Sequence, residues 1–420
     1  MKRCEPEDLQ GLISESKSIV TSMAAGEPRR FYRYISENND LFRSPTTLYC
    51  ANPSQSYSCF TDEAFAQLQV VVMFLTPSVR KHMGTRLQYF PQHLSQWAGH
   101  LAQRGVDLYW GTCSPPDRRG FVSLGPSCCY ESELLAKAKH VVLEVNPKIP
   151  MTYGSTTVST RDVDYMVSDD SSLPVVKRAQ ITDTDRTIAG HIAELVPDGA
   201  TLQLGIGSIP NAIGEALQDK KDLGIHTEMI NDTMMDLYQR GVVTGKKKSR
   251  WPGKLVGSFA YGTQELYDFL HGNPLVELHP SSVVNDPYRM GLNTLMTSIN
   301  TAVELDLTGQ VCSESVGHLE LSGVGGASET HIGAQRSPGG RGIIALHSRT
   351  KSGDSKISLE LKPGAKVSIS RNDLDTVVTE YGVAMLKGSS VRERALALIA
   401  IAHPDHRARL KDEAAKLAYI

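Results

Sequence analysis

The sequence predicts an α/β protein built from two similar domains, each containing a parallel β-sheet. Its 420 residues exceed the length at which a single hydrophobic core usually stops growing. Strand-like and helix-like segments alternate along most of the chain, which is the pattern of βαβ units. SIVTSMAAGEP (18–28) and TLQLGIGSIP (201–210) are each followed by a helical stretch, which indicates a weak internal repeat.

The first half of the chain predicts strands and helices in alternation. Residues 1–17 have the composition of a mixed polar helix, and Gly105 suits a helix C-cap. Short runs rich in β-branched and aromatic residues indicate strands, whereas longer amphipathic runs indicate helices. The expected strands span 18–23, 46–51, 69–75, 106–112 and 141–146, and the expected helices span 29–37, 92–105 and 131–140.

The periodic pattern lapses after Val167, where a polar stretch containing Pro174 predicts a linker. We therefore expect an N-terminal domain over 1–170, a linker over 171–184 and a C-terminal domain over 185–420. In the second domain we expect helices at 185–196, 211–218 and 391–402, a strand at 201–207, and a charged tail after the last helix.

The composition gives no general affinity for polyanions. The 44 Lys and Arg residues nearly balance 46 Asp and Glu residues, so the net charge of −2 provides no field for nucleic acid or an anionic membrane. The N-terminus lacks the apolar run of a signal peptide, and the densest apolar run, 70–75, is too short to span a bilayer. We expect neither a nucleic-acid nor a membrane partner.

The seven cysteines are irregularly spaced, and no two of them form a CxxC pair. This pattern supports neither a zinc site nor a redox motif. An odd number of cysteines without a regular spacing favours free thiols, and free thiols are typical of a reducing compartment. The sequence therefore predicts a cytoplasmic protein without a metal.

Glu228 lies in GIHTEMIND (224–232), about twenty residues after the glycine turn GIGSIP (205–210). Glycines allow a ligand to approach the backbone, a helix start directs N–H groups at an anion, and Pro210 suits the first helical turn. A carboxylate at a strand end beside such a turn can act as a nucleophile. The spacing also resembles a dinucleotide fingerprint, with Glu228 on a ribose hydroxyl and Pro210 in place of the third glycine. A strand–helix connection without any ligand is the third interpretation.

Three other features give weaker signals. SGVGGAS (322–328) is a second glycine turn, either a ligand-binding loop or a flexible surface loop. GKKKSR (245–250) has the composition of a solvated charged turn, which in some proteins meets a phosphate. His226 is a candidate base beside Glu228, with a structural histidine as the alternative.

Several segments taken together carry a family resemblance: TLQLGIGSIPNAI, KKDLGIHTEMIND, LYDFLHGNPLVEL, VNDPYRMG, SINTAVELDLTGQVCSESVG, SGVGG, SRNDLDTVVTEYGVAMLKG and RALALIAIAHPDHR. In order and spacing they resemble the single-chain CoA-transferases of the acetyl-CoA hydrolase/transferase family, in particular 4-hydroxybutyrate and butyrate CoA-transferases. The resemblance covers almost all of 186–420. In the first half it rests on AGEP (25–28), SPPDRRGF (114–121) and VVLEVNPKIP (141–150), and the residues before Ser18 depart from the family pattern.

The resemblance implies a fold and a set of site residues. The implied fold is two α/β domains of the CoA-transferase (NagB/RpiA-like) type, with the active site in the cleft between them. Glu228 matches the glutamate that carries CoA as a thioester, and Asn300 matches the asparagine that orients the reacting acyl group. The implied CoA-binding residues are Ile206, Gly207, Ser208, Ile209 and Pro210 in the first glycine loop and Gly325 and Gly326 in the second.

The resemblance also implies a reaction. CoA, bound as a substrate, passes from a short-chain acyl-CoA to a free carboxylic acid through an acyl-glutamyl anhydride and a glutamyl-CoA thioester, with ping-pong kinetics. Acyl-CoA hydrolysis on the same residues is an alternative. A non-catalytic ligand sensor on this fold is an alternative from another class. A homodimer is the general expectation for such an enzyme.

The sequence departs from the family pattern near the expected acyl pocket. Asn231-Asp232-Thr233 stands where the family usually has Ser-Asp-Gly, and Ala327 and Ser328 replace a Gln-Val pair. These departures leave the acid open, and itaconate, a dicarboxylate, is an alternative substrate. Its second carboxylate would need a donor, for which Arg336 and His331 are candidates.

Overall fold

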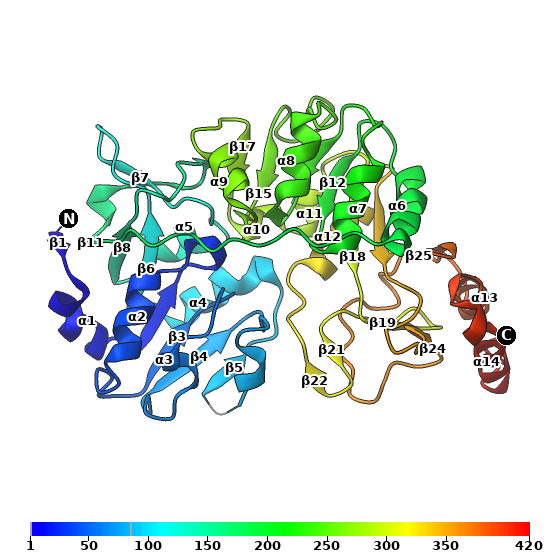
Figure 1. The fold of residues 1–420 in the computed structure, drawn as a ribbon, viewed down its shortest axis with the longest axis horizontal. Coiled ribbons are helices and arrows are strands. Elements are labelled where there is room, and N and C mark those ends of the chain that lie inside the picture. Colours follow the sequence, from blue (N-terminus) through cyan, green and yellow to red (C-terminus); the bar gives the residue numbers. More distant parts are fainter. Residues whose placement is uncertain (1, 85) are drawn as a thin grey trace. The chain divides into compact units, whose positions relative to one another are not determined.

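The structure is a computed structural model that describes residues 2–84 and 86–420. The chain divides into two compact units (Figure 1). Unit 1 comprises the residues up to Val176 together with Val256–Val284, and unit 2 comprises Lys177–Leu255 and Asn285–Ile420. The first change of unit falls within the linker expected at 171–184. The sequence pattern did not indicate that 256–284 joins unit 1, because a strand or helix looks the same whichever unit it packs against.

Unit 1 is built on an eight-stranded sheet in the order β1-β11-β8-β6-β2-β3-β4-β5. All of its pairings are parallel, as the alternating sequence pattern predicts. The strands are β1 (Lys2–Cys4), β2 (Ser18–Thr21), β3 (Thr46–Tyr49), β4 (Leu68–Val72), β5 (Leu87–Tyr89), β6 (Leu108–Cys113), β8 (His140–Val145) and β11 (Tyr165–Ser168). The mixed helix expected over 1–17 is wrong at its start, because β1 pairs with β11.

Smaller elements complete unit 1. Its helices are α1 (Gln10–Glu15), α2 (Arg29–Glu37), α3 (Ser58–Thr61), α4 (Trp97–Arg104), α5 (Glu131–Leu135), α9 (Gln264–Leu270) and α10 (Ser281–Val284), with short 3-10 turns at Pro6–Leu9, Ala24–Gly26, Arg80–His82, Leu94–Gln96 and Thr160–Asp162. The other strands are β7 (Phe121–Ser123), β9 (Tyr153–Gly154), β10 (Thr157–Ser159), β15 (Leu255–Gly257, which starts at the end of a unit 2 segment), β16 (Phe259–Ala260) and β17 (Val276–Leu278). Gly105 ends α4 with φ +86°, as its C-cap position predicts.

A buried carboxylate joins the sheet of unit 1 to helix α2. Glu144 of β8 accepts hydrogen bonds from the backbone N–H groups of Arg30 (3.2 Å) and Phe31 (2.6 Å) in the first turn of α2. It also accepts one from Trp110 Nε1 (3.1 Å), whose ring stacks on Phe31 at 4.5 Å between centroids. Burial raises the pKa of Glu144 to about 8. The helix N-terminus therefore holds this side chain in the core of unit 1.

Unit 2 contains strands in the order β26-β25-β23-β18-β12-β13. Their pairings are parallel, except that β26 runs antiparallel to β25. The strands are β12 (Thr201–Leu204), β13 (Gly224–His226), β18 (Met296–Thr301), β23 (Arg341–Ala345), β25 (Thr376–Thr379) and β26 (Gly382–Met385). Because parallel strands end at the same edge, the segments that follow β13, β12, β18 and β23 meet there. Ligand sites of open α/β sheets form at such a carboxyl edge.

Helices cover this sheet, and small strands lie in the connections. The helices are α6 (Asp183–Leu195), α7 (Ser208–Ala216), α8 (Asp232–Gln239), α11 (Pro287–Met290), α12 (Ala327–Arg336), α13 (Val391–Ile401) and α14 (Pro404–Lys416). The strands are β14 (Met229–Ile230), β19 (Glu304–Asp306), β20 (Val311–Cys312), β21 (Ser315–Val316), β22 (Leu319–Glu320) and β24 (Ile357–Ser358). The charged tail expected after 402 is helix α14, which contributes Leu410 and Ala414 to the core of unit 2.

Candidate active site

Glu228 lies at the carboxyl edge of unit 2, between β13 and β14, and is partly buried. Asn285 Nδ2 donates a hydrogen bond to its Oε2 at 2.9 Å, and the backbone of Gly326 forms another with the carboxylate. Burial raises the pKa of Glu228 to about 7, and these two hydrogen bonds oppose the rise without cancelling it. A desolvated carboxylate with few partners is more basic than one in water, which suits a nucleophile.

The second glycine turn lies directly against Glu228. A Cβ built on Gly326 would overlap Glu228 Oε2 and Asn285 Nδ2, and one on Gly325 would lie 3.5 Å from Glu228 Oε1. Gly325 also has φ +54°, which favours glycine. Position 326 therefore requires glycine because the backbone approaches the carboxylate closely, whereas position 325 favours glycine because of its positive φ. The interpretation of this turn as a flexible surface loop is wrong.

Asn285 is the side chain at this site that sequence reasoning missed. It is fully buried, and its Oδ1 has no hydrogen-bond partner among the described residues. It precedes Asp286, whose Oδ1 accepts from Arg289 N at 2.8 Å and caps α11. An Asn-Asp-Pro sequence is typical of a turn that starts a helix, so the local pattern gave no sign of a functional amide.

The first glycine loop follows β12 on the same edge of the sheet. Gly207 has φ +119° and is the N-cap of α7. Ile206 is 60% exposed, whereas Ile209 and Pro210 are buried in the first turn. The predicted loop residues therefore divide into an accessible part, Ile206 and Gly207, and a packed part that fixes the start of α7. Ser208, between them, turns its hydroxyl to Asp185 (3.0 Å).

Asn231 and Thr233, where the sequence departs from the family pattern, make structural contacts beside the Glu228 segment. Asn231 Nδ2 donates to the carbonyl oxygen of Gly205 at 3.2 Å, and its Oδ1 accepts from Met234 N at the start of α8. The Thr233 hydroxyl bonds Asn211 Oδ1 at 3.1 Å, and a Cβ on Gly214 would overlap the Thr233 methyl group. These side chains join the Glu228 segment to the first glycine loop and pack α8 against α7.

Asn300 lies near the end of β18, on the same edge as Glu228. Its Nδ2 lies within hydrogen-bond distance of Gln203 Oε1 (3.3 Å), Ser298 Oγ (3.1 Å) and Thr330 Oγ1 (3.1 Å), and its Oδ1 accepts from Gln203 Nε2 (3.4 Å). Strand β12 lies between β18 and β13, and the side chain that contacts the Glu228 carboxylate is Asn285. Asn300 therefore belongs to a polar network beside the first glycine loop.

The two donors suggested for a second substrate carboxylate lie elsewhere. His331 is fully buried, its Nε2 accepts from Asp375 N at 3.2 Å, and burial lowers its pKa to about 4. Its Nδ1 is also enclosed by protein, so a substrate carboxylate does not reach the ring. Arg336 is the last residue of α12, about 15 Å along the axis from the end that meets Glu228 at 1.5 Å per residue.

Two other candidate residues have structural contacts. His226 is buried, and its Nδ1 lies 3.2 Å from Asn293 Nδ2, so the structural interpretation holds. Lys248 of the GKKKSR turn is buried, and its Nζ donates to the carbonyl oxygens of Ile225 (2.7 Å) and Lys254 (2.8 Å). The expected solvated turn is wrong for this lysine, which secures the strand that leads to Glu228.

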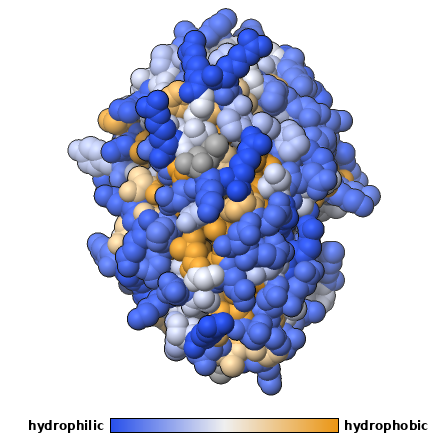
Figure 2. All heavy atoms as spheres, turned by 90° about the vertical axis from the view of Figure 1, so that its left-hand side faces the viewer, coloured by the Kyte–Doolittle hydropathy of each residue, from blue (hydrophilic) through white to orange (hydrophobic). Residues whose placement is uncertain are grey.

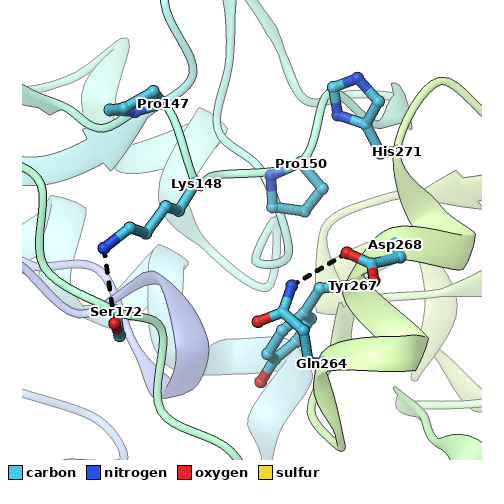
Figure 3. A pocket seen from close by; sticks show the side chains of 8 residues that line it. All are labelled: Pro147, Lys148, Pro150, Ser172, Gln264, Tyr267, Asp268 and His271. Atoms are coloured by element: carbon cyan, nitrogen blue, oxygen red, sulfur yellow. Dashed lines mark hydrogen bonds between the residues drawn. The ribbon is translucent and has the colours of Figure 1, made fainter.

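Unit 1 contains a cavity of about 400 Å³, shown in Figure 3 and lined by Pro147, Lys148, Pro150, Ser172, Gln264, Tyr267, Asp268 and His271. Lys148 Nζ donates to the carbonyl oxygen of Asp170 at 2.5 Å and lies 3.5 Å from Ser172 Oγ. On the opposite wall, Gln264 Nε2 donates to Asp268 Oδ1 at 2.9 Å. The polar groups of the walls thus bond to the protein, and none of the predicted site residues lines the cavity.

The fold and the site together indicate the class of protein. Two α/β units with largely parallel sheets, and a desolvated glutamate against a glycine turn, are the features expected of a CoA-transferase. Residues 1–177 match the acetyl-CoA hydrolase/transferase N-terminal domain, and residues 262–414 match the C-terminal domain of the same family. The chain belongs to the acetyl-CoA hydrolase/transferase family.

Relatives agree with this placement. The chain is 38% identical to succinyl-CoA:cyclohexane-1-carboxylate CoA transferase of Geobacter metallireducens, over 99% of this chain and 95% of the relative. It is 46% identical to 4-hydroxybutyrate coenzyme A transferase of Clostridium kluyveri, over 73% of this chain and 72% of the relative. The prediction of an enzyme of the CoA-transferase type is confirmed.

Two solved structures share the fold. RipA from Yersinia pestis superposes with a TM-score of 0.93 at 32% identity, covering 100% of this chain and 98% of that one. A 4-hydroxybutyrate CoA-transferase from Porphyromonas gingivalis gives a TM-score of 0.82 at 33% identity, covering 99% and 98%. The predicted CoA-transferase fold class is confirmed.

The hydropathy of the surface agrees with a sequence in which 21% of the residues are charged. Figure 2 shows one face, which is largely hydrophilic with scattered apolar side chains. Within 2–84 and 86–420, no helix combines the length and apolar character needed to cross a membrane. The cytoplasmic location and the homodimer stay predictions.

Proposed function

We propose that this protein transfers CoA between a short-chain acyl-CoA and a free carboxylic acid, with Glu228 as the covalent nucleophile. One observation carries the proposal. The Glu228 carboxylate is desolvated, its pKa is raised to about 7, and it accepts hydrogen bonds from Asn285 Nδ2 at 2.9 Å and from the backbone of Gly326. Family membership supports the same chemistry and gives no support to a dinucleotide-binding role for Glu228.

The reaction balances in four steps. A Glu228 oxygen attacks the acyl-CoA carbonyl, the C–S bond breaks, and an acyl-glutamyl anhydride and the CoA thiolate result. The thiolate then attacks the glutamyl carbonyl and releases the first acid, which leaves a glutamyl-CoA thioester. The second acid, as its carboxylate, attacks this thioester to give a new anhydride and the thiolate. The thiolate attacks the new acyl group, which frees Glu228 and releases the product thioester.

The contacts of Glu228 suit the second and third steps. When sulfur or a carboxylate attacks the glutamyl carbonyl, negative charge develops on an oxygen of Glu228 itself. Asn285 Nδ2 and the Gly326 backbone already hydrogen-bond that carboxylate, so they are oriented before the charge forms. A donor of this kind contributes about 3–4 kcal/mol to the transition state. The backbone around Ile206 and Gly207 is our candidate for the oxyanion of the acyl group.

The choice of acid is proposed from the relatives and not from the contacts of Glu228. The relatives named above act on 4-hydroxybutyrate in one case and on cyclohexane-1-carboxylate with succinyl-CoA in the other. We propose a short-chain monocarboxylate of the 4-hydroxybutyrate, butyrate or acetate type. Itaconate is the second candidate, although of the two donors suggested for its extra carboxylate His331 is fully buried and Arg336 lies at the far end of α12. Rates with acetate, butyrate, 4-hydroxybutyrate, succinate and itaconate as acceptors of CoA would separate these two.

A trapping experiment tests the covalent role. Incubation with butyryl-CoA in the absence of an acceptor acid should leave one CoA bound as a thioester at Glu228, detectable by intact-protein and peptide mass spectrometry. Glu228→Ala should abolish both the adduct and transfer. Glu194→Ala, which removes an exposed glutamate of α6 in the same unit, should retain both.

The outcomes distinguish the alternatives. An adduct that decays to free CoA at the rate of turnover, with or without an acceptor, would establish a hydrolase. Binding of acyl-CoA without any adduct would favour the ligand sensor. Transfer by Glu228→Ala at the wild-type rate would overturn the proposal.

A further inference from the structure

A buried carboxylate on α6 joins two segments of the carboxyl edge of unit 2. Asp185 is fully buried, and its Oδ1 accepts hydrogen bonds from Ser208 Oγ (3.0 Å) and from His347 Nε2 (2.8 Å). Ser208 begins α7 directly after the first glycine loop, and His347 follows β23 by two residues. One oxygen atom therefore connects the segment after β12 with the segment after β23.

The second oxygen of Asp185 holds the carboxylate itself in place. Oδ2 accepts from the backbone N–H of Thr182 (2.8 Å) and from its hydroxyl (2.7 Å), while the Thr182 hydroxyl accepts from Asp185 N (3.2 Å). This is a capping box at the start of α6. Burial raises the pKa of Asp185, but its hydrogen bonds lower the pKa by more, so the net shift is downward. These hydrogen bonds include those from Thr182, His347 and Ser208. The carboxylate is thus ionised and accepts only.

An ionised Asp185 fixes the state of the His347 ring. Because the carboxylate accepts, Nε2 must carry the proton that forms the 2.8 Å bond. The side chain of His347 is 34% exposed, and its Nδ1 has no hydrogen-bond partner among the described residues. A buried carboxylate that loses a donor is costly, so His347 holds Oδ1 in the orientation that Ser208 needs.

The first glycine loop is held by hydrogen bonds on both sides of Ile206, because the carbonyl oxygen of the next residue, Gly207, accepts from Asn211 N in the first turn of α7 at 3.2 Å. At one end, Gly205 N donates to the carbonyl oxygen of Ile299 at 3.1 Å, and its own carbonyl accepts from Asn231 Nδ2 at 3.2 Å. At the other end, the Ser208 side chain is held by Asp185. Ile206 is 60% exposed and Gly207 is conformationally permissive. Packing therefore does not fix Ile206, whose position depends on the hydrogen-bonded residues before and after it.

We propose that Asp185 and His347 are positioning residues of the transfer reaction, which act through Ser208 to hold Ile206 and Gly207 where their backbone stabilises the oxyanion of the acyl-CoA substrate. This inference rests on the proposed function of Glu228 and deepens it. His347 and Asp185 touch no reacting atom in this scheme. Their effect is on the transition state, in which a displacement of about 1 Å can cost about 100-fold in rate.

Single substitutions of Ser208 and His347, the two residues that donate to Asp185 Oδ1, test the inference. Ser208→Ala and His347→Ala should each lower kcat by about tenfold and leave KM for butyryl-CoA within about twofold, since the loss is of transition-state stabilisation. His347→Gln keeps an N–H donor for Asp185 and should recover most of the rate. The double variant should be no slower than Ser208→Ala, because both changes release the same loop end.

Matched controls separate positioning from folding. Ser390→Ala removes a serine hydroxyl that donates to Glu393 in the cap of α13, and His406→Ala removes an imidazole that lies 2.9 Å from the carbonyl oxygen of Gly353. Both should leave kcat unchanged, and thermal melts of all variants would show how far each one is destabilised. Full activity in His347→Ala, or equal loss in His347→Ala and His347→Gln, would overturn the inference. If the inference on His347 fails but Glu228→Ala is inactive in the same assay, the proposed function of Glu228 still stands.

Discussion

At the scale of single residues, the Glu228 carboxylate determines how the reaction should depend on pH. Its pKa is raised to about 7 mainly by burial, and only the ionised form attacks a carbonyl. The rate of adduct formation with saturating butyryl-CoA should therefore rise about tenfold per pH unit below pH 7 and level off above it. Stopped assays between pH 5 and 8.5 would measure the midpoint. A flat profile would mean that Glu228 ionisation does not limit this step.

Asn285 gives a second prediction for the same carboxylate. Its hydrogen bond lowers the pKa of Glu228 against the effect of burial, and it donates to the oxygen that becomes charged. Asn285→Ala should move the midpoint of the pH profile above that of the wild type and reduce kcat by about 100-fold. Asn273→Ala is a control, because Asn273 bonds backbone groups at the end of α9 in unit 1. An unshifted midpoint would show that Asn285 does not contact the carboxylate in solution.

At the scale of elements, the second glycine turn has to approach Glu228 more closely than any side chain permits. Gly326→Ala would place a methyl group on Glu228 Oε2 and Asn285 Nδ2, so transfer should fall by about 100-fold or more. The variant should still fold, since the overlap is with side-chain ends. Steady-state kinetics and a thermal melt would measure both. Transfer at the wild-type rate would contradict the close approach.

Gly190→Ala is the matched glycine control in the same unit. Gly190 lies inside α6, and a Cβ there would meet nothing within 4 Å. Alanine has the higher helix propensity, so unfolding should become harder by about 0.5–1 kcal/mol, with no change in transfer rate. Denaturant titration would give the difference. A decrease in stability would show that the helix is strained at this position.

The elements also show what the sequence could and could not predict. The buried parallel strands and both glycine turns were predictable, because each depends on local composition and spacing. Asn285 was not, since its role depends on a contact with Glu228, 57 positions away in sequence. The same holds for Lys248, whose burial against Ile225 and Lys254 cannot be inferred from a run of lysines. Long-range contacts of this kind carry no local pattern.

At the scale of the whole molecule, buried carboxylates in both units should determine how stability changes with pH. Glu144 in unit 1 and Glu228 in unit 2 have pKa values raised to about 8 and about 7, above the ordinary value of about 4.3. Between those values the folded protein binds more protons than the unfolded chain, so stability falls as pH rises. His331 acts in the opposite direction, because its pKa is lowered to about 4, but that effect ends near pH 6.5.

The window from pH 6.5 to 8 lies above the titration of His331 and contains the folded-state pKa values of Glu144 and Glu228. Over it the free energy of unfolding should fall by about 2–2.5 kcal/mol, since each group contributes at most about 1.4 kcal/mol per pH unit while it is still protonated in the folded state. Glu144→Gln keeps an oxygen for the backbone N–H of Phe31 and removes the charge, so it should reduce the slope without abolishing transfer. Denaturant titrations at pH 6.5, 7.25 and 8 would measure the slope for both proteins. A flat slope in the wild type would mean that the buried carboxylates of the native state are solvated or already paired, and the raised pKa invoked for Glu228 as nucleophile would lose its support. An unchanged slope in Glu144→Gln would mean that Glu144 does not titrate in this window.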